Sequence, residues 1–180
     1  ATLEPSAAAT RSAAGGAAPG GRLSRIAVPF ALRACRLHAR AGASVRRVGS
    51  RRLLPVRRSR GWCPDPVPLP LSSPHVVLAV GAALKSTFCL TRGDEAYVSQ
   101  HLGDLDDYAT LKSFVDEIER MSELLGVVPE LVAHDLHPEY PSTRYAQERT
   151  GVELLAVQHH HAHIASCLAD NGRSRPVIGV

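Results

Sequence analysis

Aromatic residues and closely spaced cysteines are both scarce in this chain of 180 residues. Phe, Trp and Tyr make up 4% of the sequence. Its four cysteines, Cys35, Cys63, Cys89 and Cys167, lie far apart and form no CxxC pair, which excludes the ligand spacing of a zinc ribbon or a thioredoxin-like site. Few and widely spaced cysteines also argue against a secreted disulfide scaffold, and they favour free thiols in a reducing compartment such as the cytoplasm.

Long apolar runs and a P-loop are missing as well. No window holds the roughly 18 uninterrupted apolar residues that a membrane span needs. The best run, IAVPFAL, is broken by Pro29 and followed by Arg33 and Arg36. The phosphate-binding motif GxxxxGK[ST] does not occur. We therefore predict no membrane span and no P-loop.

Acidic residues are nearly absent from the first third of the chain. Residues 1–60 contain thirteen arginines and one acidic residue, whereas residues 61–180 contain eight Lys or Arg and sixteen Asp or Glu. This contrast predicts a disordered, low-complexity basic tail over residues 1–56. The composition of residues 1–43 also permits a transit-peptide interpretation, but a solvated basic surface is favoured. Five prolines between positions 64 and 74 predict an extended linker over residues 57–74. A globular domain is expected over residues 75–180.

From residue 76 onward, β-favouring runs are followed by a helical pattern. The apolar run HVVLAVG predicts a buried strand, and STFCLTRG and EAYVSQH predict two more strands joined by a turn at residues 92–95, which makes a three-stranded meander. Apolar residues three and four positions apart then predict a helix that Asp106 caps and Gly126 ends.

The remaining segments alternate strand and helix. PELVAHD and ELLAVQ predict strands, STRYAQERTG predicts a helix that begins at Ser142 or Thr143, the histidine-rich stretch opens a helix to about Asp170, and RPVIGV begins another strand. The order β-β-β-α-β-α-β-α-β predicts an α/β fold in which crossover helices join parallel strands. It is the order of the first lobe of actin-like ATPases.

Four histidines within five positions, in the stretch VQHHHAHIAS, indicate chemistry most strongly. His159 and His163 are four apart, so on a helix they share one face, and two imidazoles there can reach one divalent metal at roughly 2 Å. His160 with His163 is a poorer second pair, and surface histidines are the alternative to any metal site. The position directly after a strand favours ligand binding. Zinc and iron both suit imidazole ligands.

A second polar stretch, GAALKSTFCL, follows the first predicted strand. Gly81 permits a close backbone approach there, and Lys85, Ser86 and Thr87 offer a cation and two hydroxyl groups to the phosphate of a nucleotide. A plain hairpin is the alternative interpretation of this stretch.

A third polar stretch, HDLHPEYPSTRYA, lies at the carboxyl end of a predicted strand. Arg144 suits the clamping of a phosphate or carboxylate, and His134 suits proton transfer near neutral pH. His134 and Asp135 also end a strand close to the histidine pair, so they are a potential source of further ligands. Ser142 and Thr143 are interpreted as helix caps.

Four stretches in this order resemble the HypF-type carbamoyltransferases of [NiFe]-hydrogenase maturation. They are LAVGAALKSTFCL, SQHLGDLDDYATLKSF, VAHDLHPEYPSTRYA and VQHHHAHIAS, and the proline-rich RRSRGWCPDPVPLPL precedes them. The resemblance covers residues 57–180, whereas residues 1–43 do not share it.

The resemblance implies the first part of an actin-like ATPase domain related to the enzymes that make threonylcarbamoyladenosine on tRNA. It implies that carbamoyl phosphate and ATP yield carbamoyl adenylate, and that the carbamoyl group passes to the carboxy-terminal cysteine of the partner protein HypE. It also implies that His159 and His163 are metal ligands, with His160 and His161 in substrate or surface roles.

The resemblance also sets what the chain is expected to do alone. Family members continue beyond VIGV into a second lobe with a phosphate loop and the third metal ligand, and they carry acylphosphatase-like, zinc-finger and YrdC-like domains whose motifs are not visible here. We therefore expect an inactive fragment with weak metal binding at most. Two alternatives are a tRNA-modifying transferase and a non-catalytic nucleic-acid-binding protein. The low aromatic content and the lack of a reader element argue against the second.

Overall fold

The computed structural model describes residues 42–48 and 53–179, which all belong to one compact unit, Ala39–Val180. The predicted tail therefore falls largely outside the described residues. Disorder was expected for the tail, but its described part is ordered, because β1 (Val45–Val48) and β2 (Leu53–Arg57) pair in an antiparallel hairpin. The valines at both ends of β1 and the Val56 of β2 favour an extended strand over a coil.

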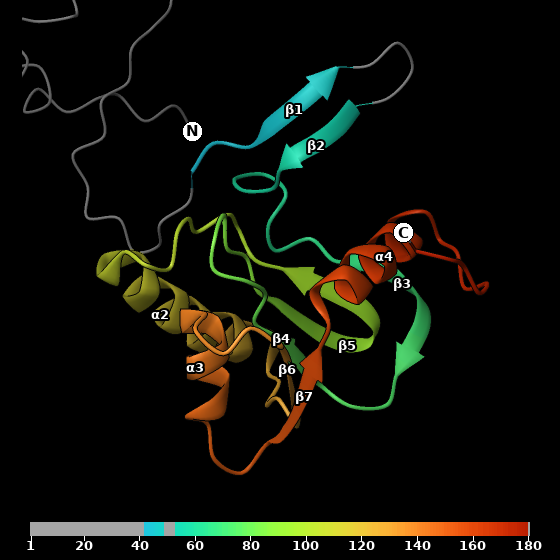
Figure 1. Cartoon of the computed structure of the whole chain (residues 1–180). Coiled ribbons are helices and arrows are strands. Elements are labelled where there is room, and N and C mark those ends of the chain that lie inside the picture. The colour runs from blue at the N-terminus through green and yellow to red at the C-terminus, as the bar shows by residue number, and fades with distance from the viewer. Residues whose placement is uncertain (1–41, 49–52, 180) are drawn as a thin grey trace, which may run out of the picture. The chain divides into compact units, whose positions relative to one another are not determined.

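A five-stranded sheet with the order β3-β5-β4-β6-β7 forms the body of the unit (Figure 1). Its members are β3 (Val67–Ser73), β4 (Val77–Ala79), β5 (Cys89–Val98), β6 (Leu131–Asp135) and β7 (Glu153–Val157). β3 and β4 each pair antiparallel with β5, whereas β4, β6 and β7 run parallel to one another. The α/β prediction is confirmed, because helices connect the parallel strands.

The predicted linker over residues 57–74 is wrong for its second half, since β3 is part of the sheet. Pro68 pairs with Glu95 of β5, with an irregular register between Pro68 and Ser73. A proline cannot donate to a strand ladder, and sheets accept it on edge strands. β3 is an edge strand, so its prolines are compatible with pairing on one side only.

β5 contains the turn that the sequence predicts between two strands. Ser99 N donates to Phe88 O at 2.8 Å, so the residues flanking the two ends of β5 are neighbours. Ten extended residues would span roughly 33 Å, so the chain must fold back inside β5. Gly93, with φ of 64°, lies at the middle of this reversal. The first half of β5 pairs with β4 and the second half with β3.

Helix α2 (Tyr108–Leu125) begins one residue later than predicted. Asp107, not Asp106, is the cap, because its Oδ2 accepts from Thr110 N at 2.9 Å. Gly126 ends the helix in the left-handed conformation, as expected. Phe114, fully buried on this helix, packs edge-on against Phe88 and Tyr145 at 5.9 and 5.4 Å between ring centroids.

Two other helices flank the sheet, α3 (Pro141–Gln147) and α4 (His159–Asp170). The main core lies between the sheet and the pair α2 and α3, whereas α4 lies apart from that pair and contacts β3 (Figure 1). No residue of α4 is fully buried, and four of the five residues of β7 are exposed. The sheet is thus well covered on one face only, and none of the described helices is long and apolar enough to cross a membrane.

The strand predicted from RPVIGV is not formed. Residues 175–179 have no strand pairing, and Val180 lies outside the described residues. Gly179 packs against Ile164 of α4, so closely that a Cβ at this position would lie 2.5 Å from Ile164 Cγ1. A strand needs a neighbouring ladder, and this segment contacts a helix surface, with Ile178 94% exposed.

His101 connects two loops that the sequence does not link, and this connection predicts a pH dependence. Its backbone N donates to Arg58 O at 3.1 Å, and its ring hydrogen-bonds to the Lys85 backbone. Burial, followed by the positive charges of Arg57 and Lys85, holds the pKa of His101 below its ordinary value of 6.5, despite the opposing hydrogen bond.

The unfolded chain therefore binds a proton at His101 more readily than the folded chain does. The stability contribution of this residue is complete above pH 6.5 and is lost as the pH falls below that value. His101→Gln should show a shallower loss of urea resistance than the wild type between about pH 7 and pH 5. Equal slopes for the two proteins would contradict this assignment.

Candidate metal and phosphate site

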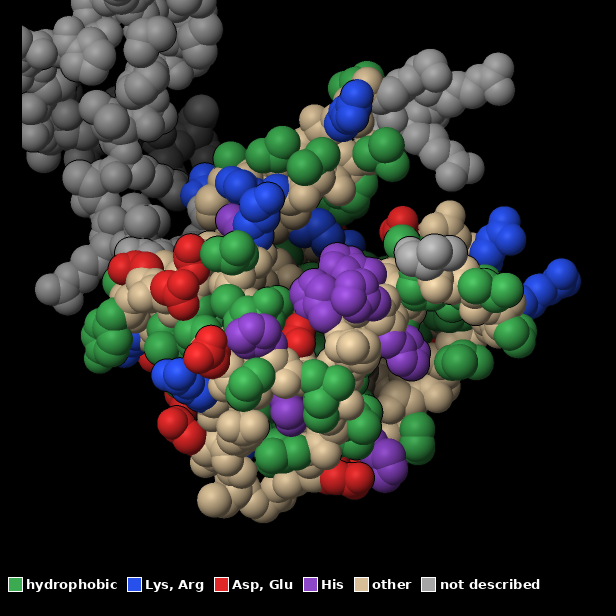
Figure 2. All heavy atoms as spheres, in the orientation of Figure 1, with side chains coloured by type: hydrophobic (Ala, Val, Ile, Leu, Met, Phe, Trp, Pro, Cys, Tyr) green, Lys and Arg blue, Asp and Glu red, His purple; other side chains and the backbone are tan. Residues whose placement is uncertain are grey.

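A cavity of about 570 Å³ lies on the poorly covered face of the sheet. It is bounded by the ends of β4, β6 and β7, by the loop of residues 81–87 and by α4. Its polar lining includes Lys85, Ser86, Asp135, His159 and His163. The carboxyl ends of parallel strands are where open α/β sheets bind ligands. The space-filling view shows histidine side chains gathered over α4 at this face (Figure 2).

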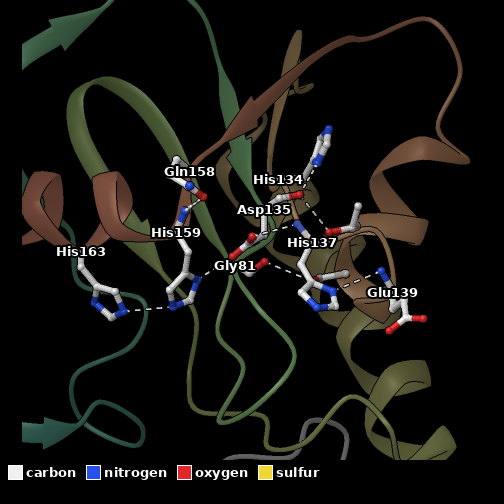
Figure 3. Close-up of polar contacts among 10 residues, drawn as sticks. Gly81, His134, Asp135, His137, Glu139, Gln158, His159 and His163 are labelled. Atoms are coloured by element: carbon white, nitrogen blue, oxygen red, sulfur yellow. Dashed lines mark hydrogen bonds and ion pairs between the residues drawn. The ribbon is translucent and has the colours of Figure 1, made fainter.

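The histidine pair of α4 converges as the spacing predicts. His163 Nε2 lies 3.1 Å from His159 Nε2, and the two rings are 4.7 Å apart between centroids (Figure 3). Gln158 is the cap residue before the helix, and its side chain accepts from His159 N at 3.1 Å. One helical turn therefore brings two ring nitrogens of different residues to the same point.

Asp135 orients His159 from the neighbouring strand. Its Oδ2 lies 2.6 Å from His159 Nδ1, and its own side chain is 9% exposed. Because an ionised carboxylate only accepts, Nδ1 carries the proton, and the Nε2 of a neutral His159 then has a lone pair that faces His163 Nε2. Burial opposes ionisation of Asp135, but hydrogen bonds from His159 and from the His137 backbone outweigh it, so its pKa lies below the ordinary range.

The main chain around Asp135 is also held firmly. Its carbonyl oxygen accepts from His134 Nδ1 at 2.8 Å and from Thr143 Oγ1 at 3.2 Å, while Oδ1 accepts from His137 N at 3.0 Å. His134 is thus fixed by a local contact and is 9% exposed. Its Nδ1 supports the strand end that carries Asp135, and His134 also lines the cavity, so its predicted role in proton transfer stays a prediction.

The loop of residues 81–87 approaches the cavity in a constrained conformation. Gly81 has φ of 67°, and a Cβ there would meet Thr87 O at 2.7 Å. Lys85, which is exposed, has φ of 52°, an uncommon value for a residue with a side chain. The Ser86 hydroxyl is buried, with the residue 2% exposed, and has no hydrogen-bond partner among residues 42–48 and 53–179. Strained backbone and an unpaired buried hydroxyl are typical of ligand sites.

Other predicted site residues lie elsewhere. His160 and His161 line a second cavity of about 860 Å³, formed by the other side of α4 and residues 174–179, which His163 also borders. Arg144 is exposed on α3 and does not line either cavity. The structure thus brings together the histidine pair, Asp135 and the Lys85 to Thr87 loop, and separates them from Arg144.

The capping role predicted for Ser142 and Thr143 is wrong. Tyr140 is the cap residue, without a side-chain hydrogen bond, and Pro141 occupies the first turn of α3. Ser142 Oγ donates to Gly81 O at 3.0 Å, and Thr143 donates to Asp135 O. Both side chains are buried. Proline at the first helical position has no N–H to satisfy, so these hydroxyls are available for tertiary contacts that support the site.

The donors present fit a metal ion held through two imidazoles. A tetrahedral ion bound at about 2.0–2.1 Å places two ligand nitrogens about 3.3 Å apart, close to the separation of the two Nε2 atoms. The carboxylate on the opposite nitrogen of His159 is a common partner of a metal-bound histidine. Within residues 42–48 and 53–179, no group of three or more His, Cys, Asp or Glu side chains forms a complete ligand set.

Residues 72–170, more than half of the chain, match the model of the HypF Kae1-like domain. Over 128 residues the chain is 50% identical to Carbamoyltransferase HypF2 of Cupriavidus necator, and over 125 residues it is 44% identical to Carbamoyltransferase HypF of Rhizobium leguminosarum. Both alignments cover 69% of this chain and 16% of the relative, so the chain spans about a sixth of the length of these relatives.

Solved structures agree with the sequence relatives. A full-length HypF in its phosphate- and nucleotide-bound form superposes with a TM-score of 0.73 and 42% identity, covering 77% of this chain and 22% of that one. HypF of T. kodakarensis gives a TM-score of 0.65 and 35% identity, covering 73% and 18%. The fold is therefore that of a Kae1-like α/β domain. The chain belongs to the HypF family.

Proposed function

We propose that this chain supplies one wall of a metal-dependent carbamoyl-transfer site. The observation that carries the proposal is the convergence of His159 and His163 beside Asp135, within the residues that match the HypF Kae1-like domain. Relatives that share this segment are carbamoyltransferases by name, and one similar structure holds phosphate and nucleotide. By this proposal the substrates are carbamoyl phosphate and ATP, which yield carbamoyl adenylate, and the acceptor is the carboxy-terminal cysteine of a HypE-type partner.

His159 and His163 would hold the metal, zinc or iron, through their Nε2 atoms, with Asp135 fixing the tautomer of His159. When bound, such an ion supplies charge stabilisation and a template for phosphate oxygens. Two imidazoles leave coordination positions open, so the remaining ligands would come from water or from residues beyond those described.

The loop of residues 81–87 would contact the phosphates of the nucleotide. Lys85 supplies a positive charge at the cavity, and Ser86 supplies a buried hydroxyl that makes no hydrogen bond within the described residues. Hydrogen bonds and charges directed at phosphate oxygens are the usual means of binding nucleotides. Gly81 allows this loop to pass close to the chain at Thr87.

A chimaera tests the proposal, because the chain spans only part of its relatives. Residues 72–170 would replace the corresponding segment of Cupriavidus necator HypF2, and transfer of labelled carbamoyl from carbamoyl phosphate to HypE would be measured with ATP present. The chimaera should transfer the label. Introducing His159→Ala should lower the rate by roughly 100-fold or more, since it removes a ligand.

Cys167→Ala is the matched control, because Cys167 is exposed on the same helix and lines neither cavity. It should leave transfer unchanged. A chimaera that folds and binds HypE, yet transfers equally well with and without His159, would refute the assigned role of the metal pair.

A further inference from the structure

A second group of unpaired polar atoms lies outside the cavity, on the turn between β2 and β3. Ser59 O accepts from Trp62 N at 2.9 Å and from Cys63 N at 3.0 Å, which closes the turn. Ser44 Oγ accepts from Ser59 N and donates to Arg60 O. The backbone of the turn therefore has hydrogen bonds from within the turn and from Ser44, the residue before β1.

Several side-chain atoms of the same turn, in contrast, lack hydrogen-bond partners in the part of the chain that the structure describes. The buried side-chain atoms without a partner in the described residues number four, and three of them are here: Arg58 Nε, Ser59 Oγ and Trp62 Nε1. Ser59 is 1% exposed. Leaving a buried polar atom unpaired costs free energy, and such atoms are rare in native proteins. All three atoms lie within five residues of the chain, and no group of the described residues pairs with them.

The chemistry of the three atoms defines which ligand would pair with them. The Nε of arginine and the Nε1 of tryptophan only donate, and a serine hydroxyl can donate as well. Arg58 Nη2 is already used, donating to Trp62 O at 3.1 Å and to Asp65 O at 2.9 Å. The three unpaired atoms are therefore hydrogen-bond donors, and a ligand that pairs with them must be rich in acceptor atoms.

Charge points to an anion. The guanidinium groups of Arg46 and Arg58 lie 5.1 and 5.7 Å from the centroid of the Trp62 ring. The ion pairs of the described residues involve neither arginine. Lys and Arg side chains also gather around β1, β2 and the turn after β2 (Figure 2). An oxyanion with several oxygens satisfies both the donors and the uncompensated charge.

We propose that the turn of residues 58–62 is a second oxyanion site, which binds a phosphate group through Arg58, Ser59 and Trp62. It lies outside residues 72–170 and shares no residue with the metal pair or its cavity. His101 bonds to Arg58 O and to the Lys85 backbone, and so connects this turn with the loop at the cavity. The proposal does not depend on the proposed carbamoyl transfer.

Trp62 is the single tryptophan of the chain, so its fluorescence reports on this turn alone. The full 180-residue chain would be titrated with inorganic phosphate at constant ionic strength, set with sodium chloride. The fluorescence of Trp62, excited at a wavelength selective for tryptophan, should change with phosphate concentration and reach saturation. Arg58→Lys keeps the charge but loses Nε, and it should weaken phosphate binding about tenfold. Arg173→Lys, an exposed substitution far along the chain, should bind as the wild type does.

Ser59→Ala gives an independent test that survives if Arg58→Lys fails to fold. Without phosphate, removing an unpaired buried hydroxyl should leave the melting temperature unchanged or raise it. With phosphate, the increase in melting temperature should be smaller than in the wild type. A parallel titration with ATP identifies the source of the phosphate: a response to ATP alone assigns it to a nucleotide. No saturable response to either probe, or equal binding by wild type and both variants, overturns the proposal.

Discussion

Replacing both His159 and His163 with alanine is expected to abolish metal binding by the purified chain. The two Nε2 atoms are the only nitrogen pair that α4 presents at metal-ligand separation, 3.1 Å, and removing both takes away every ligand assigned here. Metal content after equilibration with Zn²⁺ and dialysis measures the effect, which should be a loss of roughly 100-fold or more in affinity.

Two further variants make this result specific. His161 lies two positions from each member of the pair and lines the other cavity. His161→Ala removes an imidazole from the same helix, and this variant should retain metal. Asp135→Asn keeps both ligands but removes the carboxylate that orients His159, and it should weaken binding by about 10–100-fold. Metal content that stays unchanged in the double variant would show that the pair is not the ligand set.

Gly81→Ala is expected to destabilise the fold by about 2–3 kcal/mol, from left-handed backbone strain and a steric clash together. The added Cβ would lie 2.7 Å from Thr87 O, which is a backbone atom and cannot rotate away. The strand end and the loop must separate to accept it. Urea unfolding with circular dichroism measures the loss.

Gly126→Ala separates the two contributions. Gly126 has φ of 63°, close to the value at Gly81, but nothing lies within 4 Å of a Cβ placed there. This variant should lose only about 1 kcal/mol, the cost of the left-handed backbone. If both variants lose the same stability, the close approach of the loop to Thr87 contributes nothing.

The histidine pair could be predicted from the sequence because its geometry is local. A spacing of four on a helix fixes which ring nitrogens meet, whatever surrounds the helix. The partner of His159 could not be assigned in this way. Asp135 is placed by the parallel register of β6 and β7, in which Asp135 pairs with Val157, two residues before His159. The sequence indicates both strands but not the register between them.

Competition between local and tertiary contacts explains the other differences. Ser142 and Thr143 satisfy a helix-capping pattern, yet both hydroxyls donate to strand ends of the folded domain. Two of the five prolines that predict a linker, Pro68 and Pro70, instead occupy an edge strand, where only one side is paired. The order of elements from β4 to α4 was predictable from apolar periodicity. This periodicity shows which face of an element is buried, whichever element packs against that face. Which polar group meets which partner depends on distances that periodicity does not contain.

The first turn of α3 sets the spacing between the two halves of the site. Ser142 donates a hydrogen bond to Gly81 at the start of the loop of residues 81–87, and its neighbour Thr143 donates one to Asp135, whose side chain contacts His159. Two adjacent residues of one short helix thus fix the distance between the loop of residues 81–87 and the end of β6. A shift of this helix would move both contacts together, so affinity for a metal and affinity for a phosphate should change in parallel across substitutions that displace α3.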